Sequence, residues 1–317
     1  MQKQIKIIIL AFEIAILAGI LGVFWYYEPQ KFPESGYYTV VMLPDTQNYS
    51  SNHPEILKLQ TKWIADNIKK ENIVFAVSVG DIVNNYDNEK QWQNARTAYD
   101  LIQGKLPLGL LLGNHDMSQK REAVLFKKYF PFSANKKYNW EGEDFPAGTG
   151  YNSFQLFSIG KEKFIAIDLS LCPTNDVVAW ANKILEKYAD RKAILSTHGY
   201  LGLFAIRNIS ISKGQMGGCT STPNNTQYIW DDIIAKNKNV LLVLSGHMHA
   251  VAKRIDYNDG KPVLQILADY QTEANGGNGW MRLLQFDVAN KQIHVRTYSP
   301  YLNEYDTDIS NDFVLNY

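Results

Sequence analysis

The sequence lacks a net charge and contains very little cysteine. Its 317 residues include 32 Lys and Arg against 32 Asp and Glu, so the formal net charge is zero. This balance argues against duplex nucleic acid as a partner, because a basic surface dominates binding to it. The two cysteines, Cys172 and Cys219, are too few for a disulfide scaffold or a four-sulfur zinc site, although one bridge can form. A metal ion would have to be bound mainly by His, Asp, Asn or Glu.

Charged residues are nearly absent from residues 7–27, where Glu13 is the only one. At about 1.5 Å per residue this stretch is long enough to cross about 30 Å of hydrocarbon. Lys3 and Lys6 precede it and an aromatic cluster closes it, which predicts a membrane anchor over residues 1–27 with a cytoplasmic N-terminus. The alternative is a signal peptide, cleaved in a secreted protein, although the apolar run is long and no Ala-x-Ala site follows it. Under both interpretations the remaining chain is extracytoplasmic.

The composition changes after the anchor. Residues 28–36 are polar with two prolines and one glycine, which is typical of a linker. From residue 37 to residue 317, apolar runs typical of strands buried on both faces alternate with helical patterns. The apolar runs are residues 39–43, 72–79, 107–112, 163–168, 192–197 and 239–245, and the clearest helical patterns are 54–69 and 175–188. Later runs separated by NDG, NGGNG and AN predict antiparallel hairpins. We therefore expect one α/β domain with mixed sheets.

Five polar motifs each follow an apolar run, at the end of the strand where open α/β sheets bind ligands. They are Asp45-Thr46-Gln47, Gly80-Asp81, Gly113-Asn114-His115-Asp116, Thr197-His198-Gly199 and Gly246-His247-Met248-His249. A single histidine is more often structural than a ligand. Four of the 6 histidines fall in this set, which favours a metal site.

This ordered series resembles the calcineurin-like metallophosphoesterase family, whose pattern is D-x-H, G-D, G-N-H, H and G-H-x-H. The resemblance covers roughly residues 38–255 and implies a four-layer α/β/β/α sandwich with two divalent metal ions. It implies that a phosphate mono- or diester is hydrolysed by attack of a metal-bound hydroxide. It also implies one ion among Asp45, Gln47, Asp81 and His249, a second among Asp81, Asn114, His198 and His247, a bridging role for Asp81, and His115 as the acid.

The charge of such a site suits a phosphate anion. Two divalent ions bring four positive charges, and Asp45 and Asp81 remove only two, because His, Asn and Gln are neutral ligands. A bridging hydroxide leaves a net charge of about plus one, which attracts a phosphate and stabilises charge that develops during in-line displacement. His115 is adjacent to Asn114 and can give a proton to the leaving alkoxide.

Two positions depart from the family pattern. Gln47 stands where the family usually has histidine, and its harder oxygen donor favours manganese or iron over zinc at the first site. The alternative is a catalytically weak or inactive relative that serves as a surface binding protein. Asn84 stands where related phosphatases often carry an Asp that orients the acid histidine, so it would orient His115 without adding charge.

Other candidates lie outside the motifs. Asp168 ends a strand and is expected behind the metal ligands, while Tyr270, Gln271 and Asn278 belong to a Gly- and Asn-rich loop that can contact substrate. Residues 199–226 form a long connection after His198, which favours a lid. Cys172 and Cys219 follow runs that can be neighbours in a sheet, so a disulfide between them is predicted, with two unrelated thiols as the alternative. A nuclease for duplex DNA is disfavoured, whereas nucleotides remain open as substrates.

Overall fold

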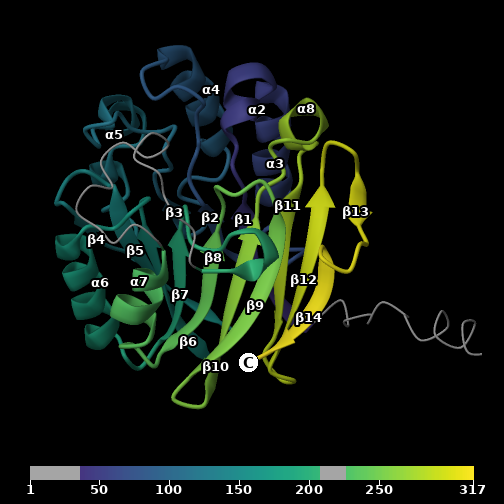
Figure 1. The fold of residues 1–317 in the computed structure, drawn as a ribbon. Coiled ribbons are helices and arrows are strands. Elements are labelled where there is room, and N and C mark those ends of the chain that lie inside the picture. Colours follow the sequence, from purple (N-terminus) through teal and green to yellow (C-terminus); the bar gives the residue numbers. More distant parts are fainter. Residues whose placement is uncertain (1–35, 208–225) are drawn as a thin grey trace, which may run out of the picture. The chain divides into compact units, whose positions relative to one another are not determined.

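Two seven-stranded sheets organise the chain in a computed structural model that describes residues 36–207 and 226–317 (Figure 1). The first sheet has the order β13-β12-β11-β1-β2-β3, and β14 also pairs with β12. Its strands are β1 (Tyr37–Leu43), β2 (Ile73–Ser78), β3 (Leu108–Leu110), β11 (Met281–Asp287), β12 (Gln292–Ser299), β13 (Glu304–Asp306) and β14 (Asp312–Asn316). β1 runs parallel to β2 and antiparallel to β11, so this sheet is mixed.

The second sheet is also mixed, with the order β4-β5-β6-β7-β8-β10-β9. Its strands are β4 (Glu141–Phe145), β5 (Asn152–Ile159), β6 (Glu162–Leu169), β7 (Lys192–Thr197), β8 (Val240–Ser245), β9 (Val251–Asn258) and β10 (Lys261–Ala268). β6, β7, β8 and β10 are parallel neighbours, while β5 and β9 pair antiparallel at the two sides.

Three apolar cores separate four layers. Along β1, Val41 and Leu43 face a core shared with helices, whereas Val40 and Met42 face the second sheet. This alternation explains why β1 reads as a continuous apolar run, because both of its faces are buried. The helices on the first sheet are α2 (Gln47–Asn52), α3 (Pro54–Asn67), α4 (Glu89–Tyr99) and α5 (Val124–Tyr129), and those on the second are α6 (Asn175–Lys187) and α7 (Gln227–Ile229).

The predicted α/β domain with mixed sheets is confirmed over Tyr37–Tyr317, which form one compact unit. All six predicted strands and both predicted helices are present, and β9–β10 and β11–β12 form the expected hairpins. The predicted strand at 107–112 is shorter in the structure, since only Leu108–Leu110 pair with β2.

Three predictions concern residues outside the described part of the chain. The anchor over residues 1–27 and nearly all of the linker fall within residues 1–35, and most of the long connection after His198 falls within residues 208–225. Among the described residues, no helix is both long and apolar enough to cross a membrane.

Candidate metal centre

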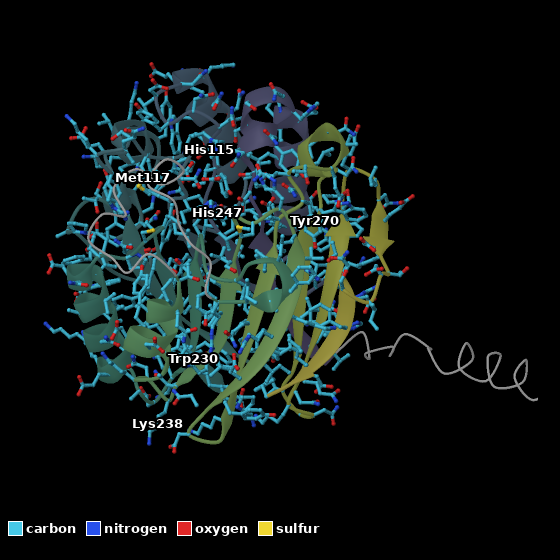
Figure 2. All side chains as sticks on the ribbon, viewed as in Figure 1. His115, Met117, Trp230, Lys238, His247 and Tyr270 are labelled. Atoms are coloured by element: carbon cyan, nitrogen blue, oxygen red, sulfur yellow. The ribbon has the colours of Figure 1, made fainter. Side chains whose placement is uncertain are left out.

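Both sheets contribute polar side chains to one edge of the domain. Asp45 and Asp81 follow β1 and β2 of the first sheet, and His198 and His247 follow β7 and β8 of the second. Each of these strands is parallel to its partner in the pair, so their carboxyl ends meet at the same side of each sheet. Figure 2 shows His115 and His247 toward this end of the strands, well away from Lys238.

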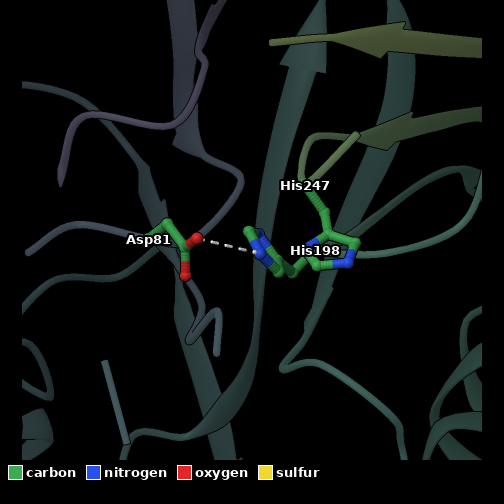
Figure 3. Close-up of side chains that lie close together, drawn as sticks. All are labelled: Asp81, His198 and His247. Carbon is green, nitrogen blue, oxygen red and sulfur yellow. Dashed lines mark ion pairs between the residues drawn. The ribbon is translucent and has the colours of Figure 1, made fainter. Parts of the chain in front are cut away.

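Asp81, His198 and His247 form the tightest group of possible metal ligands, with donor atoms within 4.8 Å of one another (Figure 3). Asp81 Oδ2 lies 3.3 Å from His198 Nε2, and the same nitrogen lies 3.1 Å from Asn114 Oδ1. The imidazole centroids of His198 and His247 are 4.9 Å apart. These four side chains are those expected around the second ion, and the structure brings them together.

The imidazole of His198 is oriented by the backbone. Its Nδ1 lies 2.8 Å from the carbonyl oxygen of Val79, and the side chain is completely buried. Because a carbonyl can only accept, Nδ1 carries a proton, and Nε2 is the ring nitrogen that faces Asp81 and Asn114. A second hydrogen bond of this kind is the usual way to fix the tautomer of a metal-binding histidine.

The residues expected around the first ion also fit a metal. Asp45 is buried, and its two oxygens accept the backbone N–H of His247 at 3.3 and 3.1 Å. Gln47 begins α2, and its Oε1 is buried without a hydrogen-bond partner among the described residues. An unsatisfied buried oxygen costs free energy unless an ion or water meets it. His249 is exposed and lines the cleft described below.

The pKa values in the site are shifted because the buried acids Asp45 and Asp81 lie near the imidazole of His198. Burial raises the pKa of Asp45 well above its usual value, and the carboxylates of Asp269 and Asp81 raise it further against the opposing effect of His198. Burial also opposes ionisation of Asp81, but His198 and His115 outweigh it and hold its pKa below the usual value. Burial lowers the pKa of His198, yet Asp81 and Asp45 raise it to about 10. The protein alone therefore favours a positive charge at this point.

His247 behaves in the opposite way. Burial and the neighbouring His198 lower its pKa to about 4, so the imidazole is neutral near neutral pH. A neutral imidazole is the form that binds a metal. Its backbone is left-handed, with φ of 72°, as is that of Asp81 with φ of 49°.

The loop after β3 holds His115 against Asp81. The His115 backbone N–H donates to Asp81 Oδ1 at 2.9 Å, and its Nδ1 lies 2.8 Å from the backbone oxygen of Asn84. Asn84 thus orients the ring through its main chain, while its side chain donates to Asn85. The sequence therefore predicted correctly that Asn84 orients His115, but not that it does so through its backbone carbonyl.

Two residues of the site escaped sequence reasoning. Asp116 is buried and accepts the N–H groups of Val83 and Gly113 at 3.0 and 2.9 Å, which fixes the loop beside Asp81. Burial, followed by repulsion from Asp81, raises the pKa of Asp116 to about 7. Asp269, which follows β10, is buried near Asp45. Asp116 belongs to the third motif and Asp269 follows an apolar run, but the sequence assigned no role to either residue.

An open cleft of about 1500 Å³ reaches the site. Many of its lining side chains are neutral amides, namely Gln47, Asn48, Asn84, Asn85, Asn114, Gln119 and Gln271. Lys120 and Glu122 are the lining residues of fixed charge outside the metal group, and no arginine lines the described part of the cleft. Met117, Leu203, Ile206 and Met248 add apolar surface.

The remaining candidates are placed as follows. Gln271 lines the cleft, but Tyr270 is buried away from it, with its hydroxyl 3.1 Å from Thr297 Oγ1 and 2.9 Å from Asn311 Oδ1. Asn278 follows α8 (Ala274–Gly277), and its carbonyl accepts the hydroxyl of Ser299.

Asp168 lies inside the domain rather than in the cleft, because a Cβ on Gly109 of β3 would stand 2.5 Å from its Oδ2. Cys172 is buried, and Cys219 is outside the described residues, so the disulfide stays a prediction.

The order of the strands and the polar side chains at their ends are those of a metallophosphoesterase fold, and residues 38–251 match the model of the calcineurin-like phosphoesterase family. The chain belongs to this family. Its sequence is 38% identical over 289 residues to the uncharacterized protein YvnB of Bacillus subtilis (strain 168), a match that covers 87% of this chain and 21% of YvnB. This chain therefore spans about a fifth of the length of that relative.

Two further proteins are similar at lower identity. The probable glycerophosphodiester phosphodiesterase GpdQ of Arcobacter nitrofigilis is 25% identical over 213 residues, covering 65% of this chain and 68% of GpdQ. The structure of purple acid phosphatase PPD1 from yellow lupin (Lupinus luteus) seeds aligns with a TM-score of 0.54 at 12% identity, covering 90% of this chain and 55% of PPD1. The second likeness concerns the fold alone.

Proposed function

We propose that this chain hydrolyses a phosphodiester at a two-metal centre, and that residues 1–27 anchor it to the cell membrane with the site outside the cytoplasm. The observation that carries the proposal is the group of Asp81, His198 and His247, in which Asp81 and His198 are buried and the donor atoms lie within 4.8 Å of one another. The unpartnered buried oxygen of Gln47, which lines the same cleft as Asp81, adds a further candidate ligand.

The donor set would divide between two ions, with Asp81 available to both. Asp45, Gln47, Asp81 and His249 would hold the first ion, and Asp81, Asn114, His198 and His247 the second. When bound, the two ions supply Lewis acidity toward the phosphoryl oxygens and lower the pKa of a bound water. The oxygen donors of Asp45 and Gln47 favour manganese or iron at the first position, with zinc as the softer alternative.

His115 is placed to give a proton to the leaving oxygen. Its Nδ1–H donates to the Asn84 carbonyl, so Nε2 is the ring atom that exchanges a proton with substrate. Its main chain is held by Asp81, which couples the position of the acid to that of the shared carboxylate.

The cleft favours a diester over a monoester. A diester carries one negative charge and two organic groups. The cleft offers room, amides and apolar surface, and Lys120 is the one fixed cation among its described lining residues. Amide groups donate to and accept from hydroxyls, as a glycerol or sugar would present. The likeness to a probable glycerophosphodiester phosphodiesterase supports the same choice.

The location rests on the N-terminal sequence. Lys3 and Lys6 before an apolar stretch over residues 7–27 follow the positive-inside pattern, which puts the phosphoesterase domain outside the cytoplasm. Diesters of the cell envelope or of the medium would then be the accessible substrates.

The test compares two model substrates with the full chain, purified in detergent and loaded with Mn²⁺. We expect near two ions per chain and a kcat/KM for bis(para-nitrophenyl) phosphate at least about tenfold above that for para-nitrophenyl phosphate. A faster monoester reaction would refute the diester assignment. A protein with no bound metal and no turnover would instead support the surface binding protein.

A further inference from the structure

We propose that Asp269 belongs to the metal centre as a third carboxylate beside Asp45 and Asp81, on the side of the site where Gln47 replaces a histidine. The inference rests on the proposed function, because it requires a site that binds metal. It adds a residue that lies outside the five motifs of the sequence.

The backbone places Asp269 between the two loops that carry the first-ion residues. Its N–H donates to the carbonyl of Ala250, the residue after His249, at 3.0 Å. Two residues later, the carbonyl of Gln271 accepts the side-chain amide of Asn48, the neighbour of Gln47, at 3.0 Å. The segment after β10 is thus fastened on one side to the His249 loop and on the other to the start of α2.

The Asp269 carboxylate is held by one neighbour. The backbone N–H of Gln271 donates to Oδ1 at 2.9 Å, and the side-chain Nε2 of Gln271 donates to Oδ2 at 3.0 Å. The side chain is buried, with 3% of its surface exposed. Each oxygen accepts one of these bonds and keeps a second lone pair. This arrangement fixes the orientation of the carboxylate in the way that outer carboxylates of metal sites are fixed.

The surrounding charges are those of the metal group. The carboxylate lies near enough to Asp45 to contribute more than Asp81 does to the raised pKa of Asp45. The cationic groups that act most strongly on Asp269 itself are the imidazoles of His249 and His198. Asp269 therefore lies within electrostatic range of Asp45, His249 and His198, all residues of the proposed site.

In the metal-free protein the carboxyl groups of Asp45, Asp81 and Asp269 lie around one imidazole, that of His198, so a bound metal ion would relieve the repulsion that His198 leaves uncompensated. Asp269 should consequently strengthen metal binding while it destabilises the metal-free fold. A carboxylate with a structural role alone would stabilise both forms, so the two roles differ in sign. The added oxygen charge also favours manganese over zinc, in the same direction as Gln47.

The experiment uses Asp269→Asn in the full chain, with Asp287→Asn as the matched control. Asp287 is a buried aspartate at the end of β11, and its oxygens accept the N–H and Nδ2 of Asn290 at 3.0 and 2.7 Å, so it has the same kind of clamp. It does not belong to the metal group. Mn²⁺ affinity of the metal-free proteins is measured by calorimetry, and Tm is measured with and without Mn²⁺.

We expect Asp269→Asn to weaken the binding of one of the two ions by about tenfold or more, within the range typical of outer-shell carboxylates. Its metal-free Tm should equal or exceed that of the wild type. Asp287→Asn should leave both affinities unchanged and lower both Tm values. A second variant, Gln271→Ala, keeps the charge of Asp269 but removes one of its two donors, and should give a smaller loss of affinity.

Wild-type affinity for both ions in Asp269→Asn, together with a lower metal-free Tm, would overturn the inference and leave the proposed function standing. If Asp269→Asn does not fold, unchanged affinity in Gln271→Ala overturns the inference instead. A wild-type protein that binds no Mn²⁺ would overturn the proposed function and the inference together.

Discussion

Asp81 is the residue on which most contacts of the site converge. Its Oδ1 accepts the N–H of His115, and its Oδ2 lies 3.3 Å from His198 Nε2. Asp81→Asn removes the shared charge, and we expect turnover to fall by about three orders of magnitude or more. Steady-state kinetics with metal analysis measures this. Asp66→Asn, in an exposed ion pair with Lys62, is the control. Retention of about a tenth of the wild-type rate would contradict the assignment.

Asp168 provides a test of stability away from the cleft. Asp168 is completely buried, and burial, followed by repulsion from Glu141, raises its pKa to about 8 against the opposing effect of the Ser196 and Gln155 side chains. The folded state therefore holds a proton that the unfolded state releases at about pH 4. The contribution of Asp168 to stability is complete below that pH and is lost as the pH rises to about 8.

Asp168→Asn mimics the protonated acid. We expect it to raise the free energy of unfolding at pH 8, on the order of 1–3 kcal/mol, and to change it little at pH 4. Chemical denaturation of variant and wild type at both pH values measures the difference. If the substitution changes the free energy of unfolding equally at the two pH values, or lowers it at pH 8, then Asp168 is not held in its protonated form in the folded protein.

At the residue scale, the motifs identified side chains that the structure brings together, but not the groups that hold them in place. Asp45, Asp81 and His198 were expected as metal ligands because they match the family pattern at strand ends. Asp116 lies in the third motif and Asp269 lies outside all five, but the sequence assigned no role to either, because their roles depend on where their carboxylates point. For the same reason the sequence could not show that Asn84 orients His115 through its carbonyl oxygen.

At the scale of elements, the strands that could be predicted from the sequence are those buried on both faces. Strands buried on both faces, such as β1 and β8, have continuous apolar runs that stand out. β4 has the sequence EGEDF and α4 has EKQWQNARTAY, so neither displays a strong apolar pattern, and both were missed. β3 was predicted too long, because its apolar run continues past the last paired residue, Leu110, toward the metal ligands.

The turn after β8 gives a prediction for an element. Gly246 precedes His247, and a Cβ at this position would stand 2.0 Å from Asp45 Oδ1. Gly246→Ala should displace Asp45 and weaken metal binding by about tenfold or more while the strand still forms. Calorimetry with Mn²⁺ measures this. Gly260→Ala is the control, since nothing lies within 4 Å of a Cβ there and only its φ of +74° adds strain. Equal metal affinities in the two variants would contradict the steric argument.

At the scale of the whole molecule, the prediction to test is that residues 1–27, which lie outside the described residues, anchor the protein to the membrane. If residues 7–27 form an anchor, protease added to intact cells should cut within residues 28–36 and release an active soluble fragment. Immunoblotting of the medium with an activity assay measures the release. Protection of the domain until the cells are lysed would reverse the predicted orientation. A free domain in untreated medium, with a new N-terminus near residue 28, would favour a cleaved signal.

The position of β1 also determines when the domain can be completed during synthesis. β1 lies between β2 and β11, and Tyr37 pairs with Asp287, so the first strand to leave the ribosome waits for one of the last. Until residue 287 has emerged, β1 has one open edge, and the segment that carries Asp269 has no fixed place. Such open edges invite pairing with other chains. We therefore expect the nascent chain to depend on a chaperone or a translocation channel that prevents β1 from pairing with other chains until the β11–β12 hairpin has been synthesised.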